Sequence, residues 1–351
     1  MSIPGPALGR PWLRRRNARL LRDAGRSVDE AGYIRAGGID HFVTIRGASR
    51  DNPVLVFLHG GPGMTQTVFA AQTLRWEEHV TVVQYDQRGC GKTRHRNGPA
   101  ADGELSFERL RLDATDLIDA LRHKLGVAKV ILAASSAGST FGLQLAASRP
   151  DLLYAYVGTD QHAVVAESKT TARANVLETL RRTGNRKGIR ALERMPSDPA
   201  EWSQAQSRAL DRWAVKADPD IPNMVTDVVF PAMMTSPLHT MADIRELNAG
   251  MTESTRQLYP ELAAFDARAV APEIRIPFFV FQGADDNVTP AECTRAFAET
   301  VRAPVTRFAT IPRTGHLAAF TRPEEFLRLL VEYVLPVVPG TSGSHACSTP
   351  G

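Results

Sequence analysis

Residues 130–138 read Val-Ile-Leu-Ala-Ala-Ser-Ser-Ala-Gly, and this stretch decides the fold. It begins with an apolar run, which is typical of a strand buried on both faces of a sheet. Small residues follow, and residues 138–148 favour a helix that Pro150 ends. A strand that turns abruptly into a helix exposes the residue at the turn on the carboxyl edge of its sheet. The segment therefore predicts a strand–turn–helix unit with a reactive side chain at the turn.

Two adjacent serines occupy this turn. The backbone there is crowded, so the residues two places before and two places after a nucleophile must be small. Ser136 has Ala134 and Gly138 in those places, whereas Ser135 lacks the glycine. We therefore predict Ser136 as the nucleophile.

The same strand pattern recurs along the chain. Apolar runs predict further strands at 54–58, 80–85, 153–158, 277–282 and 305–311. Helices are expected at 107–125, after Thr289-Pro290, and at 323–334. Segments 32–36 and 40–46 predict a hairpin. Strands that alternate with helices indicate an α/β protein with a mostly parallel sheet and helices on both faces.

The strand pattern is interrupted between residues 161 and 268. Helical segments are expected there at 169–182, 188–194, 201–216 and 241–248, separated by prolines. The predicted domains are a basic N-terminal extension (1–30), a core (31–160 and 269–338), a helical cap (161–268) and a disordered tail (339–351). Because the cap leaves and re-enters at the carboxyl edge of the sheet, we expect it to cover the active site.

A glycine-rich loop follows the first buried strand. Residues 59–63 read His-Gly-Gly-Pro-Gly. A transition-state oxyanion needs two preorganised N–H donors. We predict the amides of Gly61 and Ala137 as these donors, and we expect His59, Gly60 and Ser135 to contribute to substrate binding.

The acid of a catalytic triad is expected after the strand at 277–282. Residues 285 and 286 are both aspartates, and their spacing from Gly283 and Pro290 favours Asp286 over Asp285. Either could instead be a turn residue or a charge at a helix N-terminus. Asp160, at the end of an earlier strand, is the reserve candidate.

Among nine histidines, His316 is the one placed to serve as the base. It follows Thr314-Gly315 on the loop after the last predicted strand. It also completes the chain order Ser, Asp, His that hydrolases with such a serine turn use.

Two motifs and the serine turn resemble the proline iminopeptidase-related family of α/β-hydrolases. The motifs are HGGPG at 59–63 and DQRGCGKT at 86–93. The resemblance implies an α/β-hydrolase fold with a helical cap, a triad of Ser136, His316 and Asp286, and no cofactor. The second motif would brace the entrance of the site; it lacks the glycine spacing of a phosphate-binding loop.

The sequence departs from this family in two places. The family has a tryptophan after its nucleophile, where this chain has Ala137, so we expect a reshaped acyl pocket. Family members that remove N-terminal proline hold the substrate amine with cap glutamates in fixed motifs, which this chain lacks. The substitutes considered are Glu246, Glu253 and Glu261, for which a solvated helix charge is the preferred interpretation.

Composition limits the class of protein. The chain has 351 residues and a formal net charge of +4, with five arginines within residues 14–22. Such a segment could contact nucleic acid or a membrane surface, but no aromatic platform or recognition motif accompanies it, so a solvated helix face is preferred. Three scattered cysteines, Cys90, Cys293 and Cys347, form no disulfide framework or metal pattern and fit a reducing compartment.

We therefore expect a cytoplasmic protein without a metal, a cofactor, or a nucleic-acid or membrane partner. No apolar run resembles a secretory signal or a membrane span. The predicted activity is cleavage of an amide or ester bond through an acyl-enzyme, aminopeptidase-like, on a small-molecule or peptide substrate. The atypical serine turn leaves one alternative: a non-hydrolytic, acyl-transfer, cyclase or binding role on a specialised metabolite. The sequence leaves the oligomeric state open.

Overall fold

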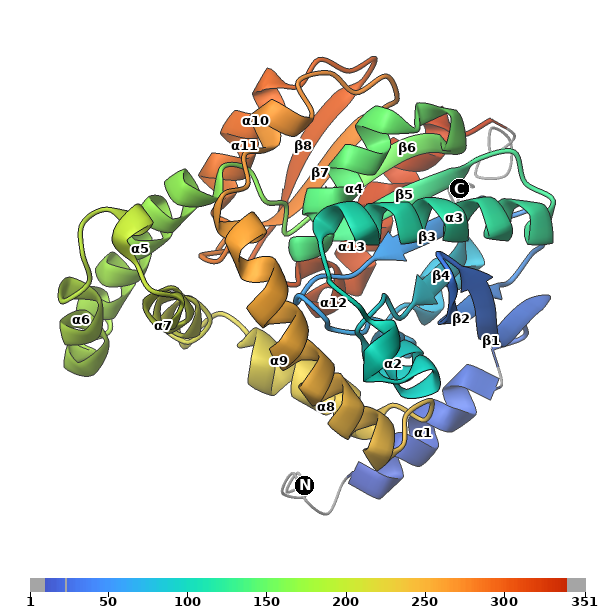
Figure 1. Ribbon diagram of the computed structural model, residues 1–351, viewed down its shortest axis with the longest axis horizontal. Coiled ribbons are helices and arrows are strands. Elements are labelled where there is room, and N and C mark those ends of the chain that lie inside the picture. The colour runs from blue at the N-terminus through green and yellow to red at the C-terminus, as the bar shows by residue number, and fades with distance from the viewer. Residues whose placement is uncertain (1–9, 23, 340–351) are drawn as a thin grey trace, which may run out of the picture.

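The computed structural model describes residues 10–22 and 24–339, and its centre is one eight-stranded sheet (Figure 1). The strand order is β1-β2-β4-β3-β5-β6-β7-β8. The bounds are β1 Val28–Ala36, β2 Ile39–Gly47, β3 Val54–Leu58, β4 Thr81–Tyr85, β5 Val130–Ser135, β6 Leu153–Thr159, β7 Phe278–Gly283 and β8 Thr306–Ile311. All the expected strands are present, and the predicted fold class is confirmed.

The sheet is parallel from β4 to β8 and antiparallel at its β1 edge. Strands β1 and β2 form the predicted hairpin, with Ala36 opposite Ile39 at the turn. However, β1 begins at Val28 and pairs there with Gly47, four residues before the expected start. The last residues of the predicted N-terminal extension therefore belong to the sheet.

Helices cover both faces of the parallel sheet because its central strands are buried on both sides. Along β3, Val54, Val56 and Leu58 point into one core cluster, whereas Leu55 and Phe57 point into the other. The first cluster is covered by α3 (Phe107–Leu125), α4 (Ala137–Ser148), α10 (Ala267–Val270) and α11 (Ala291–Thr300). The second is covered mainly by α12 (Ala318–Thr321) and α13 (Pro323–Leu329), which continues as a π-helical turn and a 3-10 turn to Val337.

Helix α3 has the ends that its sequence predicts. The Ser106 hydroxyl accepts the N–H of Arg109 at its start, and Gly126 takes a left-handed conformation (φ 69°) after its end. This helix, in front of the sheet in Figure 1, fixes the connection between β4 and β5.

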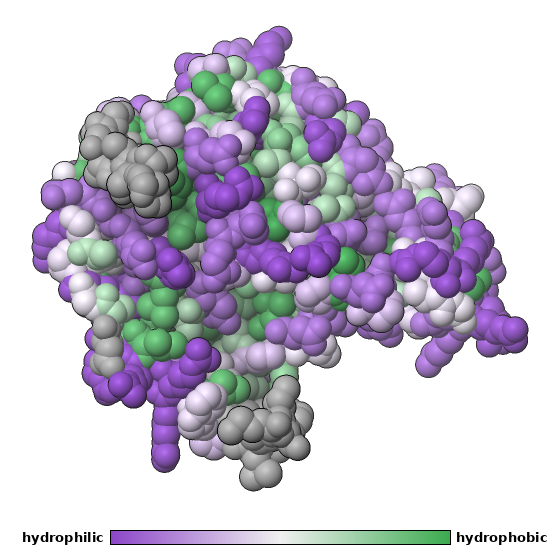
Figure 2. Space-filling view, turned by 180° about the vertical axis from the view of Figure 1, so that it is seen from behind, coloured by the Kyte–Doolittle hydropathy of each residue, from purple (hydrophilic) through white to green (hydrophobic). Residues whose placement is uncertain are grey.

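The region between β6 and β7 is helical, as expected. It contains α5 (Val165–Arg182), α6 (Arg186–Glu193), α7 (Gln204–Ala214), a π-helical turn (Met224–Val229), α8 (Phe230–Thr235) and α9 (Met241–Ala263). Helices α5 to α7 project from the sheet in Figure 1, and their outer surface is mainly hydrophilic in Figure 2. They enclose a small core of their own, which includes Val176, Leu180 and Leu210.

Two expectations about this region are wrong. Helix α9 was expected to end near residue 248 but continues to Ala263 and contains Pro260. The stretch between the expected helices at 201–216 and 241–248 is also partly helical: the π-helical turn runs directly into α8, and Pro231 lies in the first turn of α8.

The basic N-terminal segment forms helix α1 (Arg10–Arg22), which lies against α8. Arg14 donates a hydrogen bond to the His239 carbonyl oxygen at 2.9 Å, and Asn17 contacts the Thr235 hydroxyl at 3.1 Å. One face of the helix is therefore docked, while Arg15 and Arg16 are exposed. The tail after Pro339 lies outside the described residues. Across residues 10–22 and 24–339, no helix is long and apolar enough to cross a membrane.

Candidate active site

Ser136 lies at the turn between β5 and α4 in a conformation that side chains rarely adopt. Its φ is 53° and its ψ is −129°. The neighbouring backbone is so close that only small residues fit. A Cβ atom on Gly138 would lie 2.6 Å from the carbonyl oxygens of Leu58 and His59. The strained turn is the geometry that aims a serine hydroxyl away from the sheet edge.

The His316 side chain lies within hydrogen-bond distance of both Ser136 and Asp286. The His316 Nε2 atom is 2.9 Å from the Ser136 hydroxyl oxygen, and its Nδ1 atom is 2.8 Å from Asp286 Oδ2. All three residues are at least nine-tenths buried. The structure thus brings together the three residues predicted to form a triad, from loops after three different strands.

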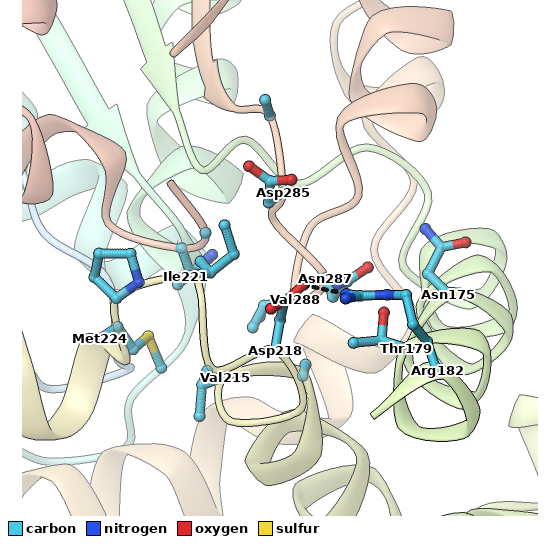
Figure 3. Close-up of a pocket in the computed structure, with 15 residues that line it drawn as sticks. Asn175, Thr179, Arg182, Val215, Asp218, Ile221, Met224, Asp285, Asn287 and Val288 are labelled. Carbon is cyan, nitrogen blue, oxygen red and sulfur yellow. Dashed lines mark hydrogen bonds and ion pairs between the residues drawn. The ribbon is translucent and has the colours of Figure 1, made fainter. Parts of the chain in front are cut away.

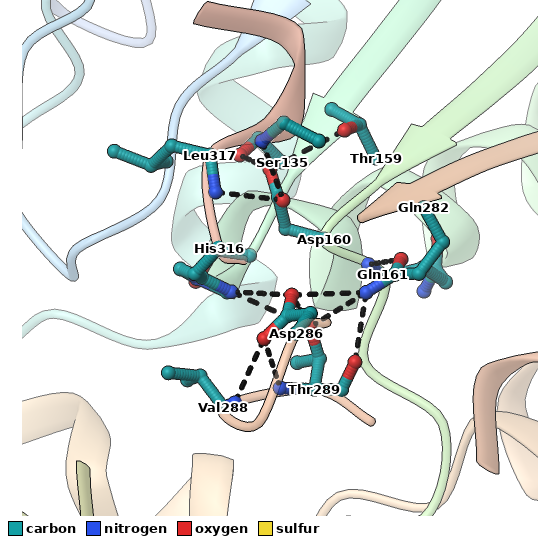
Figure 4. A network of polar contacts seen from close by, with 12 residues as sticks. Ser135, Thr159, Asp160, Gln161, Gln282, Asp286, Val288, Thr289, His316 and Leu317 are labelled. Atoms are coloured by element: carbon teal, nitrogen blue, oxygen red, sulfur yellow. Dashed lines mark hydrogen bonds and ion pairs between the residues drawn. The ribbon is translucent and has the colours of Figure 1, made fainter. Parts of the chain in front are cut away.

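The Asp286 carboxylate is held by several donors besides His316 (Figure 4). Its Oδ1 atom accepts the backbone N–H groups of Val288 at 2.7 Å and Thr289 at 3.0 Å. Its Oδ2 atom also accepts the Thr289 hydroxyl at 2.7 Å and the Gln282 amide at 3.0 Å. Asp285, the other candidate, is exposed and lines the second cavity described below.

Asp160, the reserve candidate, lies on the other side of the same imidazole loop. Its Oδ1 atom accepts the N–H groups of Leu317 at 2.8 Å and Ala318 at 3.2 Å, and its Oδ2 atom accepts the Ser135 hydroxyl at 2.9 Å (Figure 4). Within the described part of the chain, Asp160 makes no hydrogen bond to the His316 ring, so its contacts hold the loop that carries His316 rather than the imidazole itself.

Electrostatics favour a positive charge on the imidazole. Burial alone would lower the pKa of His316, but the carboxylates of Asp286 and Asp160 outweigh it and raise the pKa. Burial would raise the pKa of Asp286, but the attraction of His316 and the hydrogen bonds that the Asp286 carboxylate accepts lower it. The site is therefore suited to stabilise the imidazolium that forms when His316 takes a proton from Ser136.

Asp160, Asp286 and His316 also place three potential metal-ligand atoms within 4.8 Å of one another. These atoms already take part in the hydrogen bonds described above, and a metal would have to replace them. These three side chains are therefore better suited to hydrogen bonding with one another and with the nearby loops than to binding a cation.

The loop at 59–63 begins with a buried histidine that ties it to the loop after β4. Burial lowers the pKa of His59 to about 3, so its ring is neutral. Its Nε2 atom accepts the backbone N–H of Gln87 at 3.1 Å, and the Gln87 side chain donates to the His59 carbonyl oxygen at 2.9 Å. A Cβ on Gly60 would lie 2.6 Å from the Cβ of Ser136, so this loop passes directly beside the nucleophile.

The motif at 86–93 anchors several surrounding elements. The Asp86 carboxylate accepts the backbone N–H of Lys92 at 2.7 Å, and Arg88 forms a two-point ion pair with Asp113 of α3 at 2.7 and 3.0 Å. The Lys92 side chain reaches Asp243 of α9 at 3.0 Å. The motif thus connects the sheet to the helical region.

A cavity of about 290 Å³ opens from the nucleophile into the helical region. Its floor contains Gly61, Ser136 and Ala137, and its walls come mainly from α5, α7 and α9. The predicted oxyanion donors therefore face this cavity. His59, Gly60 and Ser135 are not among the described residues that line it and lie beneath its floor.

A second cavity, of about 260 Å³, lies on the other side of the triad. His316 lines it, together with residues of α5, the segment after α7 and the loop after β7. Arg182 and Asp218 form an ion pair within it (Figure 3). The triad is thus flanked by one cavity on the serine side and one on the histidine side.

The acidic residue that lines the first cavity was not predicted. It is Asp211 of α7, which forms an ion pair with Lys169 of α5. The three glutamates considered from the sequence do not line the cavity: Glu246 lies 3.6 Å from Arg94, Glu253 pairs with Arg256, and Glu261 accepts the N–H of Phe107. No motif marks Lys169 or Asp211, because they meet only through the packing of α5 against α7.

A parallel sheet with a strained serine turn, an imidazole and a carboxylate at its carboxyl edge defines a class of hydrolytic enzymes. The model of the α/β-hydrolase fold family matches residues 53–323, and the chain belongs to this family. It is an enzyme with the role of a hydrolase, and the resemblance to proline iminopeptidase-related members is confirmed.

Individual relatives are distant. The "Probable aminopeptidase YbaC" of Bacillus subtilis is 25% identical over 298 residues, which cover 84% of this chain and 92% of that protein. The proline iminopeptidase of Thermoplasma volcanium is 31% identical over 119 residues, 33% of this chain and 37% of that one. The crystal structure of the Mycobacterium smegmatis proline iminopeptidase superposes with a TM-score of 0.62 at 20% identity, covering 88% and 98% of the two chains.

Proposed function

We propose that this protein cleaves an ester or amide bond through a covalent acyl-enzyme on Ser136. The observation that carries the proposal is the distance of 2.9 Å from the Ser136 hydroxyl to His316 Nε2, with Asp286 on the opposite ring nitrogen at 2.8 Å. A serine is a weak nucleophile unless such a base removes its proton. The similarity to the probable aminopeptidase YbaC favours an acyl group joined to an amine as the substrate.

The mechanism follows from this arrangement. His316 accepts the hydroxyl proton as Ser136 attacks the substrate carbonyl carbon, and Asp286 stabilises the imidazolium. His316 then donates the proton to the leaving amine or alcohol. A water molecule, deprotonated by His316, attacks the acyl-enzyme and releases the acid.

The amides of Ala137 and Gly61 are the proposed oxyanion donors. Ala137 is the first residue of α4, where backbone N–H groups lack partners within the helix and the helix dipole favours negative charge. Gly61 has a φ of 121°, a conformation open to glycine but strained for other residues, and it lines the same cavity. His59 and Gly60 act beneath the donors by holding this loop.

We also propose that the predicted domain division has functional meaning. Residues 161–268 would act as a cap on the core at 31–160 and 269–338. The support is that α5, α7 and α9 supply most of the cavity wall above Ser136.

The test compares the two adjacent serines. Ser136→Ala is expected to abolish hydrolysis of p-nitrophenyl butyrate and labelling by a fluorophosphonate, because it removes the nucleophile. Ser135→Ala is the matched control, since its hydroxyl only donates to Asp160. It should keep the labelling and most of the activity. Turnover that survives in Ser136→Ala at the wild-type level would contradict the proposal.

The alternative role, a non-hydrolytic or acyl-transfer use of the fold, makes a different prediction. A binding protein would leave Ser136 unlabelled by the fluorophosphonate. An acyltransferase would label but release its acyl group to an added amine or alcohol faster than to water.

A further inference from the structure

The cavity beside Ser136 contains charged side chains that the hydrolytic mechanism does not use. Lys169 and Asp211 form an ion pair on its wall, and the side chains are 14% and 39% exposed, respectively. Arg208, one turn before Asp211 on α7, also lines the cavity, and its side chain is exposed to solvent. Charged side chains that line a substrate cavity typically fix the orientation of the ligand and provide specificity.

The charges in this cavity do not balance. Asp211 is neutralised by Lys169, whereas Arg208 forms no ion pair with any residue in the described part of the chain. His162, also on the cavity wall, adds no charge, because burial and then the nearby charges of His316 and Lys169 lower its pKa to about 3. Two cations thus face one anion, and the cavity attracts a negative group.

The position of the imidazole indicates which part of the substrate enters this cavity. His316 must donate a proton to the leaving group, so the leaving group lies on the histidine side of the triad. His316 lines the second cavity, whereas Ser136 and the proposed oxyanion donors line the first. The acyl group therefore extends into the cavity that contains Lys169 and Arg208.

We propose that this cavity recognises an acyl group that ends in a carboxylate, which Lys169 and Arg208 bind while Asp211 holds Lys169 in place. The proposal rests on the hydrolytic function proposed above and names its substrate class: a monoester or monoamide of a dicarboxylic acid. An acyl group with a free amine is disfavoured, because Asp211 is already paired and Arg208 repels an ammonium group.

The first measurement compares two esters of similar length with the wild-type enzyme. These are the neutral p-nitrophenyl valerate and the anionic mono-p-nitrophenyl glutarate. Hydrolysis of the valerate that disappears in Ser136→Ala reports the hydrolytic function by itself. A kcat/KM that is about 10- to 100-fold higher for the glutarate, the effect expected of a charge-assisted hydrogen bond, supports the anion site.

Three variants then identify the side chains responsible. Lys169→Met and Arg208→Met should each lower the ratio of kcat/KM for the glutarate to kcat/KM for the valerate, mainly by raising the KM for the glutarate. Lys187→Met is the matched control, since Lys187 is exposed on α6 and does not line the cavity. Lys169→Met also frees Asp211, so this variant should gain activity on glycine p-nitrophenyl ester, whose amine is protonated.

Two results would overturn the anion site without touching the hydrolytic function. One is equal kcat/KM for the valerate and the glutarate in the wild-type enzyme. The other is a wild-type preference for the glycine ester that Asp211→Asn abolishes, which would assign the cavity to aminoacyl groups. Absence of Ser136-dependent hydrolysis of all three esters would instead reject the proposed function itself.

Discussion

The carboxylate of Asp160 accepts the backbone N–H of Leu317 at 2.8 Å, although the two residues are 157 positions apart in the sequence. Its other oxygen accepts the hydroxyl of Ser135 at 2.9 Å. Asp160 therefore connects the residue before the nucleophile to the residue after His316. It is fully buried and has a positive φ of 52°, a conformation that costs an ordinary residue energy. Asp160 therefore acts as a positioning residue for the loop that carries His316.

Asp160→Ala should lower kcat for p-nitrophenyl butyrate by about 10- to 100-fold with little change in KM, because a small displacement of His316 is costly in the transition state. Asp160→Asn should recover most of this loss, since its amide oxygen can still accept the N–H groups of Leu317 and Ala318. Asp116→Asn, which alters an exposed carboxylate on α3, is the control and should be near wild type. A purely structural role would instead lower thermal stability and leave kcat per folded molecule unchanged.

Gly60→Ala should inactivate the enzyme without unfolding it. The new Cβ would lie 2.6 Å from the Cβ of Ser136 and 2.9 Å from the Ser135 carbonyl oxygen, and neither group can move freely. We expect a fall in kcat of about 100-fold, as for other displaced nucleophiles. The control is Gly32→Ala in β1, where an added Cβ meets no atom within 4 Å. If circular dichroism shows a folded Gly60→Ala variant with normal kcat, the loop does not constrain the nucleophile.

The proximity of Ser136, His316 and Asp286 could be predicted because each residue follows a parallel strand, and parallel strands bring their carboxyl ends to one edge. Helices whose length depends on tertiary contacts were harder to predict. Helix α9 continues past its expected end because it packs along α2 (Gly91–Asn97), where a Cβ on Gly250 would come within 2.3 Å of the Gly89 carbonyl oxygen. Propensity alone does not reveal such packing. The Lys169–Asp211 pair was missed for the same reason, since no local pattern relates the two residues.

The pH dependence of activity should reflect the raised pKa of His316. Only the neutral ring can accept the Ser136 proton, so kcat/KM should rise with pH through this pKa. The neighbouring carboxylates raise the pKa above its ordinary value of 6.5, so the acid limb of the profile should lie above pH 6.5. Asp160→Asn removes one of these charges and should move the limb to lower pH. A limb at or below pH 6.5 in the wild-type enzyme would contradict this electrostatic description.

Stability should fall in mild acid because several buried histidines resist protonation. Burial lowers the pKa to about 3 for His59 and His162 and to about 4 for His239. In the unfolded chain a histidine binds its proton near pH 6.5. Below that pH the unfolded state therefore binds protons that the folded state does not bind. The contribution of these neutral histidines to the free energy of unfolding is complete above pH 6.5. It is lost as the pH falls towards their pKa values in the folded protein. At pH 5 each such histidine costs about 2 kcal/mol relative to neutral pH.

Urea unfolding at pH 7.5 and pH 5.0 measures this loss directly. His162→Asn should reduce the difference between the two unfolding free energies by about 2 kcal/mol, since it removes one histidine that stays neutral in the folded protein. The His162 Nδ1 atom has no hydrogen-bond partner among the residues that the structure describes, so the substitution breaks no contact at that atom. His123→Asn, on the exposed surface of α3, should leave the difference unchanged. The opposite outcome is an equal loss of stability between pH 7.5 and pH 5.0 in His162→Asn and in the wild-type protein. It would mean that His162 is protonated in the folded protein at pH 5.0.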